Sequence, residues 1–250
     1  MWIYRLLSIC MAGILALFVL AGCGAHAPVK TPAAGSQITK IDGQAINWWY
    51  VRFRLVWPDE EEPDWSLDAL IAHQIIAPVL EQYDDQIQLW RFHRRAGRDS
   101  SGHQFSFIFY GSVETAAGIY AELQGDDLLN EMISANVIKK VLYDDLASTT
   151  RPGIADTSDP SWPPAVQDTW PYYIMGASRM WLGLIGETAE STAIETSPAS
   201  IDEMQIFYSS VNESITEVWQ KKGLHAFLHH LNALFGYEPL LFYEERPLRF

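Results

Sequence analysis

The sequence predicts an α+β fold, in which a ferredoxin-like antiparallel sheet has helices on one face and a mainly helical C-terminal half packs onto it. Three segments of the first half alternate apolar and polar residues with the period of a strand. A helical pattern separates the first of these segments from the second, and a short turn joins the second to the third. The later part of the chain shows helical periodicity instead.

The first strand is expected over residues 47–57. Apolar side chains occupy its odd-numbered positions, whereas Tyr50, Arg52 and Arg54 lie at even-numbered positions and therefore on the other face. We expect helices to cover the first face and to leave the second face open to solvent or to a partner. The second and third strands are expected at 86–95 and 103–110.

Helical patterns at 64–83 and at 113–123 accompany these strands, and the second continues over 128–146. The order is therefore strand, helix, strand, strand, helix. Pro78 lies inside the first helical pattern, where its ring and its missing N–H predict a kink. This order matches most of a split βαβ unit, without an evident final strand.

Residues 149–171 are rich in Pro and Trp and predict an irregular connection. The helices expected after it are at 172–185, 200–219 and 224–235. Gly223 should interrupt the helical pattern, and Gly236 should cap its end. The extended segment 240–250 is a candidate for a last strand.

Residues 1–22 have the layout of a secretory signal, with one charged residue, Arg5, before an apolar run that ends in small residues. The segment Leu20-Ala21-Gly22-Cys23 resembles the lipobox of bacterial lipoproteins. That resemblance implies cleavage before Cys23, lipidation of its thiol, and export. In enterobacterial lipoproteins an Asp after the Cys retains the protein at the inner membrane. Gly24 stands at that position here, which favours the inner leaflet of the outer membrane.

The alternatives for this segment are an ordinary signal peptide and an uncleaved anchor helix. We expect five parts along the chain, each with its own composition. They are a signal peptide at 1–22, a tether at 23–45, a ferredoxin-like half at 46–148, a connection at 149–171 and a mainly helical half at 172–250.

Charge and cysteine content exclude several classes of function. The net charge of −14 argues against nucleic-acid binding, which needs a basic footprint. The only cysteines are Cys10, inside the signal, and Cys23, so the mature chain should have no disulfide and no cysteine metal ligand. No P-loop, GxSxG or SxxK motif occurs, and no cofactor is expected. The expected partners are the membrane, through the lipid, and a protein or an anionic small molecule.

Basic and aromatic residues cluster on the expected sheet. If the strands align, one face presents the candidate ligand-binding residues Tyr50, Arg52, Arg54, Arg91, His93 and Arg95. Arginine forks match carboxylate and phosphate groups bidentately, so this pattern is typical of an anion-binding surface. The alternative is a set of ordinary salt bridges with the acids of loop 59–64 or of the helices.

The segments WYVRFRL and WRFHRR…GHQFSFIFYG, with the helix between them, resemble the C-terminal domain of lantibiotic dehydratases and its stand-alone relatives in thiopeptide-type bacteriocin biosynthesis. The resemblance covers residues 47–125. It implies a ferredoxin-like fold with an Arg-bearing strand, a turn and a His/Arg-rich strand.

Two other groups of residues are of types that often serve as metal ligands or catalytic acids. His225 and His229 lie one helical turn apart and are candidate metal ligands, with a solvated helix face as the alternative. The adjacent acid pairs are expected to act as caps and turns, because neighbouring carboxylates cannot both face one cleft. These pairs are Asp84-Asp85, Asp126-Asp127 and Asp144-Asp145.

The sequence therefore favours a lipid-anchored envelope protein that faces the periplasm and acts as a binding or assembly factor rather than as an enzyme. Two alternatives stay open. One is an envelope enzyme, metal-dependent or other, that uses His93, His103 or the His225 and His229 pair. The other is an inhibitory or immunity-type lipoprotein whose acidic surface meets a basic partner.

Overall fold

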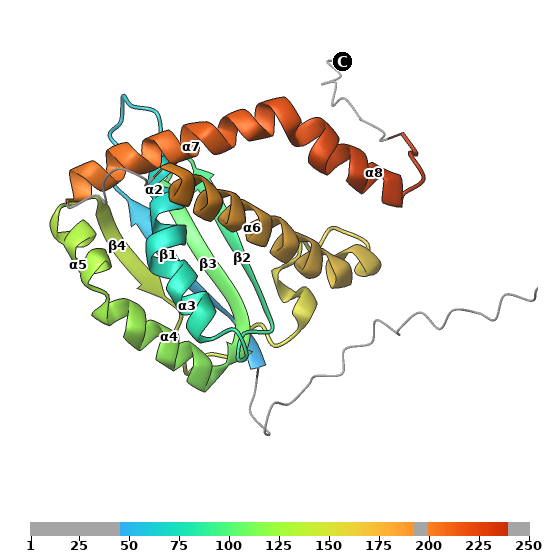
Figure 1. Ribbon diagram of the computed structural model, residues 1–250. Helices are drawn as coiled ribbons and strands as arrows, with labels where there is room; N and C mark the ends of the chain where they lie inside the picture. Colours follow the sequence, from blue (N-terminus) through green and yellow to red (C-terminus); the bar gives the residue numbers. More distant parts are fainter. Residues whose placement is uncertain (1–45, 193–199, 240–250) are drawn as a thin grey trace, which may run out of the picture. The chain divides into compact units, whose positions relative to one another are not determined.

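The computed structural model describes residues 46–192 and 200–239, all within a compact unit that spans 36–250. They contain a four-stranded antiparallel sheet with strand order β2-β3-β1-β4, accompanied by helices (Figure 1). This order is that of the ferredoxin-like arrangement and confirms the predicted α+β fold. The strands are β1 (Ile46–Leu55), β2 (Leu89–Ala96), β3 (His103–Ser112) and β4 (Ile138–Tyr143).

The helix expected over 128–146 is present only as far as Ser134, and the prediction was wrong for the remainder, where the fourth strand lies. Helix α5 (Asp127–Ser134) ends early, and Asn136 adopts a left-handed backbone with φ 57°. Asparagine tolerates this conformation better than most residues and can end a helix without a glycine. The chain then reverses into β4, which pairs with β1 and completes the sheet.

The first helical stretch is continuous but irregular. It consists of α2 (Ser66–Leu70), a π-helical turn η1 (Ile71–Ile76) and α3 (Ala77–Gln82). Pro78 lies at the start of α3, where its missing N–H and its ring are accommodated by the wider turn before it. Where the sequence predicted a kink at Pro78, the structure has a π-helical turn that ends just before it.

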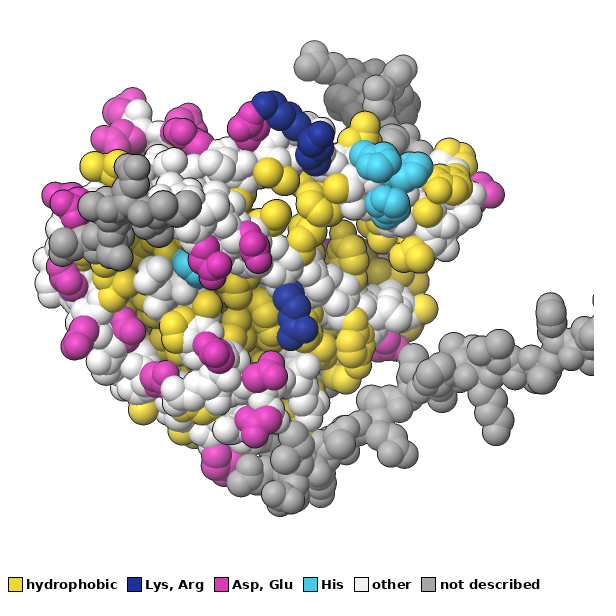
Figure 2. Space-filling model, in the orientation of Figure 1, with side chains coloured by type: hydrophobic (Ala, Val, Ile, Leu, Met, Phe, Trp, Pro, Cys, Tyr) yellow, Lys and Arg dark blue, Asp and Glu magenta, His cyan; other side chains and the backbone are white. Residues whose placement is uncertain are grey.

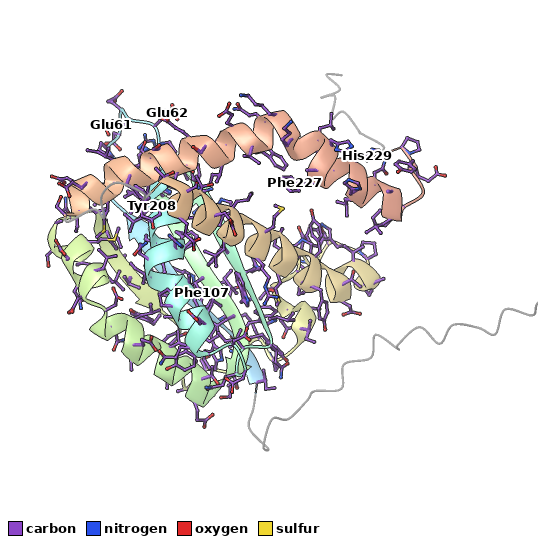
Figure 3. All side chains as sticks on the ribbon, in the orientation of Figure 1. Glu61, Glu62, Phe107, Tyr208, Phe227 and His229 are labelled. Carbon is purple, nitrogen blue, oxygen red and sulfur yellow. The ribbon has the colours of Figure 1, made fainter. Side chains whose placement is uncertain are left out.

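The main hydrophobic core lies between the sheet and the helices that cover one of its faces. Phe53 of β1 and Phe107 of β3 are completely buried there, against Leu70 and Ile75 of the first helical stretch. Helix α4 (Val113–Gly125) and α5 close the same face beside β4 (Figure 1). Phe107 is labelled at the centre of this layer in Figure 3.

The second half is mainly helical, as expected, and shares this core. Its elements are η2 (Ile154–Thr157), α6 (Pro164–Thr192), α7 (Ile201–Gly223), a π-helical turn η3 (Leu224–His229) and α8 (His230–Leu234). Helix α6 begins inside the segment expected to be an irregular connection at 149–171, and Pro171 is buried within it. That connection is therefore shorter than predicted.

Helix α6 protects the free edge of β2. The backbone N–H of Phe92 donates to Ser178 Oγ at 3.1 Å, and the Trp181 ring lies 5.6 Å from the Phe92 ring. An uncovered edge strand would offer unpaired backbone groups to other chains. The long helix removes that hazard at this edge.

Helix α7 crosses the first helical stretch, and Tyr208 is buried between them (Figure 3). The Tyr208 hydroxyl lies 2.6 Å from His73 Nδ1. Gly223 does not interrupt the helix, which corrects the expectation. A Cβ there would lie 2.9 Å from the Trp219 ring, so glycine leaves room for that side chain. Gly236, at φ 68°, follows the helix end as predicted.

Several predictions fall outside the described residues. These are the signal peptide, Cys23, the tether up to residue 45 and the strand candidate at 240–250. None of the helices in the described ranges combines the length and the apolarity needed to cross a membrane.

Candidate functional site

The sheet face that lies away from the core carries basic and polar residues in rows across the strands. The first row consists of Lys140, Arg54, Gln104 and Arg95. The next rows are Arg52, Ser106 and His93, followed by Tyr50, Ile108 and Arg91. Side chains at register positions of paired strands share a face. The six candidate residues predicted from the sequence therefore lie on one face.

The other end of this face is covered, so the expectation of a fully open face was wrong for that half. Residues 151–157 lie over it: Trp48 Nε1 donates to the carbonyl oxygens of Gly153 and Ile154, both at 3.0 Å. The Tyr110 hydroxyl donates to the carbonyl of Pro152 at 2.5 Å. Trp48 and Tyr110 are consequently buried, whereas the basic rows beyond this cover have exposed side chains at His93 and Lys140.

Tyr50 lies between two guanidinium groups at the border of the two halves. The Arg52 and Arg151 guanidinium carbons are 4.4 and 4.2 Å from its ring centroid. Asp144 accepts from both cations, with Arg52 Nη1 at 2.9 Å, and also from the backbone N–H of Tyr50 at 3.2 Å. One carboxylate thus fixes two cations around an aromatic ring and leaves the group with a net positive charge.

Arg91 is the buried cation of this face, with 8% of its surface exposed. Its guanidinium stacks 4.9 Å from the Trp170 ring, and its Nε is buried without a hydrogen-bond partner among the described residues. Burial lowers the pKa of Arg91, an effect that the neighbouring Tyr50 oxygen opposes, and an arginine remains charged regardless. Desolvation, and then the charges of Arg91 and Arg95, lower the pKa of His93.

We define the basic face by its six cations. They are Arg52, Arg54, Arg91, Arg95, Lys140 and Arg151, half of the twelve Lys and Arg residues in the described parts of the chain. Within 46–192 and 200–239, their ion pairs involve two carboxylates, Asp144 and Asp99. The basic face therefore keeps an excess of positive charge in a chain whose net charge is −14.

Three of the residues on or beside this face were not predicted to belong to it. Lys140 and Asp144 fell in a segment predicted as a helix, Asp144 as a cap or turn residue, and Arg151 fell in the expected connection. The signal that could have found Lys140 is the β-branched and aromatic run from Val137 to Tyr143, which fits a strand as well as a helix. No local sequence pattern indicates that Arg151 lies next to Tyr50 in the folded chain.

The side of the sheet that the helices cover differs in charge from the basic face. Figure 2 shows acidic side chains spread over this side, with few Lys and Arg side chains among them. Arg94 points to this side of β2, where its Nε lies 2.8 Å from Asp68 Oδ2 between the rings of Trp65 and Trp181. His103 Nε2 lies 3.1 Å from the other oxygen of Asp68. The salt-bridge alternative therefore holds for Arg94, which pairs with a helix carboxylate, and in part for Arg52 and Arg95, which pair with Asp144 and Asp99 instead of the acids expected.

The two candidate metal ligands lie elsewhere. His225 and His229 stack with ring centroids 5.2 Å apart, and Figure 3 shows His229 near the helix end that lies away from the sheet. His230 is a third ring, 5.4 Å from His225. Among the described residues, no group of three or more His, Cys, Asp and Glu side chains is arranged to hold a metal ion. A metal at this pair stays a prediction, separate from the basic face.

Known proteins give no further guide to the chain. Comparisons with protein-family models, with curated proteins and with solved structures gave no match. The resemblances to lipoproteins and to lantibiotic dehydratases therefore stay predictions, and function has to be argued from the basic face itself.

Proposed function

We propose that this chain is a non-enzymatic, lipid-anchored envelope protein that binds an anionic ligand on its basic face. The observation that carries the proposal is the concentration of six cations in an acidic chain: five lie on one face of the sheet and Arg151 lies beside it, and all but Arg91 are at least partly exposed. Surface ion pairs alone would not need this segregation, because the helices offer many more carboxylates than the sheet does.

The chemistry of the face suits a carboxylate or phosphate ligand. Arg91 and Arg54 form no ion pair with a carboxylate among the described residues, so their positive charges are not neutralised within the face. Arginine presents its donors as a planar fork that matches both anions. Gln104 and Ser106, joined at 3.1 Å in the middle of the face, add neutral polar groups between the cations.

A strong positive field on an otherwise negative protein also orients the encounter with an anion. Attraction at the basic face and repulsion elsewhere raise the association rate and make it sensitive to ionic strength. The lipid on Cys23 would hold this face near the membrane surface, where the ligand is met. Attachment by the lipid also removes the need for a basic membrane-binding surface.

The binding proposal is tested by isothermal titration of the detergent-solubilised full chain with pyrophosphate. We expect measurable binding that weakens as salt increases and that falls about tenfold or more in the double variant Arg52→Gln/Arg54→Gln. The matched control is Lys221→Gln/Lys222→Gln, which removes the same charge from the exposed end of α7. Equal losses in both variants would mean that net charge alone matters and would refute a specific face.

The anchoring part of the proposal has its own test. Replacing Cys23 by Ser should abolish palmitate labelling in cells and release the protein from the membrane fraction if the anchor is the lipid. Continued labelling of the variant, or unchanged membrane retention, would place the anchor elsewhere. This outcome would leave the binding proposal untouched, because the basic face does not depend on Cys23.

A further inference from the structure

A pocket opens at the end of the sheet where β1 leaves it, where the β2–β3 hairpin turns and where β4 begins. Its volume is about 740 Å³. This is within the range of ligand sites, roughly 300–1,000 Å³, and larger than a bare inorganic ion requires. Its lining includes four cations, Arg54, Arg98, Lys139 and Lys140. We call this cavity the end pocket.

The two arginines of the end pocket are held in place by neutral groups. Arg98 donates to the carbonyl oxygens of Pro58 at 3.0 Å and Glu61 at 2.7 Å, and its guanidinium lies 3.4 Å from the Trp57 ring centroid. Arg54 Nη1 donates to the Ser100 carbonyl at 3.1 Å. Carbonyl oxygens orient a guanidinium without cancelling its charge, so both arginines still contribute to the positive potential of the pocket.

The carboxylates of the lining neutralise little of this charge. Asp99 is bound to Arg95 Nη2 at 2.6 Å and receives backbone N–H groups of the hairpin. These contacts, the Arg95 hydrogen bond first, lower the pKa of Asp99 to about 2, and its charge is matched by Arg95. Asp59 lies 3.7 Å from Arg98 with a side chain that is 99% exposed, so solvent screens that pair.

The free donors of the pocket are therefore ammonium groups. Lys139 and Lys140 are exposed and form no ion pair among the residues that the structure describes. Both terminal nitrogens of Arg98 already donate to carbonyls, whereas Arg54 donates from Nη1 and has a buried Nε, so neither guanidinium presents a free fork to a planar carboxylate. A tetrahedral dianion suits ammonium groups and cations that converge from three chain segments. Leu55, Val56 and Trp57 line the remaining space and suit an organic body.

We infer that the end pocket binds the phosphate of a small phosphate monoester, with the organic part of the ligand along Leu55, Val56 and Trp57. The inference rests on the proposed function, because Arg54 and Lys140 belong to both the basic face and the end pocket. It adds two cations outside that face, Arg98 and Lys139, and it places the phosphate at one end of the face.

The test is a titration of the full chain with phenyl phosphate at fixed ionic strength, with benzoate as the monoanionic probe and benzyl alcohol as the neutral one. Three double variants remove equal charge: Lys139→Gln/Lys140→Gln in the pocket, Arg52→Gln/Arg151→Gln on the basic face away from it, and Lys221→Gln/Lys222→Gln on α7. Circular dichroism checks that each variant is folded, which the exposure of both pocket lysines favours.

We expect phenyl phosphate to bind the wild type more tightly than either other probe, and to lose about tenfold in affinity in the pocket variant. The face variant should lose less than about threefold, through long-range charge alone, and the α7 variant should lose nothing measurable. Benzoate binding as tight as phenyl phosphate binding would overturn the assignment.

The outcomes also separate this inference from the proposed function. If the Arg52→Gln/Arg151→Gln variant loses affinity and the Lys139→Gln/Lys140→Gln variant does not, the basic face binds the anion and the end pocket does not. If the face variant and the pocket variant lose affinity equally, only the overall positive potential of the face matters and the assignment of the phosphate to the pocket is wrong. If phenyl phosphate and pyrophosphate both fail to bind the wild type, the inference and the proposed function fall together.

Discussion

Asp144 should oppose ligand binding while it stabilises the fold, so that Asp144→Asn changes the two properties in opposite directions. Its carboxylate is 14% exposed and holds Arg52 and Arg151 on either side of Tyr50. An anion on the basic face would compete with Asp144 for these guanidinium groups. The substitution by Asn keeps the shape of the side chain and removes its charge.

The stability cost follows from the hydrogen bonds of Asp144. A hydrogen bond to a charged group contributes about 1.5–3 kcal/mol to stability. The side chains of Arg52 and Arg151 are 26% and 24% exposed, and solvent therefore weakens the bond that each makes to Asp144. Asn retains an acceptor for the backbone N–H of Tyr50. We therefore expect a loss of about 2 kcal/mol in the free energy of unfolding, or a fall of about 1 M in the urea midpoint.

The binding gain follows from Coulomb's law. A unit charge removed about 6–10 Å from a bound anion, at an effective dielectric constant of about 40–80, changes its binding free energy by about 0.4–1.4 kcal/mol. Pyrophosphate should therefore bind about twofold to tenfold more tightly to the variant. The matched control is Asp145→Asn, an exposed neighbour that caps a turn by accepting from the backbone N–H of Ala147. A weaker affinity in Asp144→Asn would refute the view that Asp144 competes with the ligand.

Three further predictions concern the framework. Asp68→Asn should destabilise the protein by about 3–5 kcal/mol in urea unfolding, because Asp68 is fully buried against Arg94 and His103. A loss below 1 kcal/mol would show that the charge of Asp68 is not needed for stability. Ser178→Ala should cost about 1–2 kcal/mol by leaving the Phe92 N–H unpaired at the β2 edge, whereas Ser210→Ala on exposed α7 should cost much less. Burial lowers the pKa of His73 from its ordinary 6.5, so below that pH the unfolded chain binds more protons and stability should fall. His73→Gln should flatten this decline, and an unchanged pH profile would contradict it.

The sequence predicted the basic face more fully than it predicted the sheet that carries it. Strand alternation depends only on local spacing, so Arg52, Arg54, Arg91 and Arg95 could be assigned to one side before any contact was known. Their rows then followed from the antiparallel register of two recognisable neighbours. The part that failed is β4, whose short apolar run fits a helical stripe and a strand equally well.

The contacts that could not be predicted from the sequence join residues that are far apart in the chain. Asp144 reaches Tyr50 only because β4 pairs with β1, and Arg151 reaches it only because the chain returns over Trp48. The end pocket is likewise assembled from three segments that are distant in sequence. No periodicity or motif in the sequence predicts these contacts, because they depend on tertiary packing rather than on local propensity.

The central claim is that a positively charged site on the sheet binds an anion, and Arg54 is the arginine common to the basic face and the end pocket. The most direct measurement is therefore the dissociation constant of phenyl phosphate for the wild type and for Arg54→Gln, with urea midpoints measured on both. We predict an affinity that is about tenfold weaker in a variant of nearly unchanged stability. Equal affinities for the two proteins would contradict the claim.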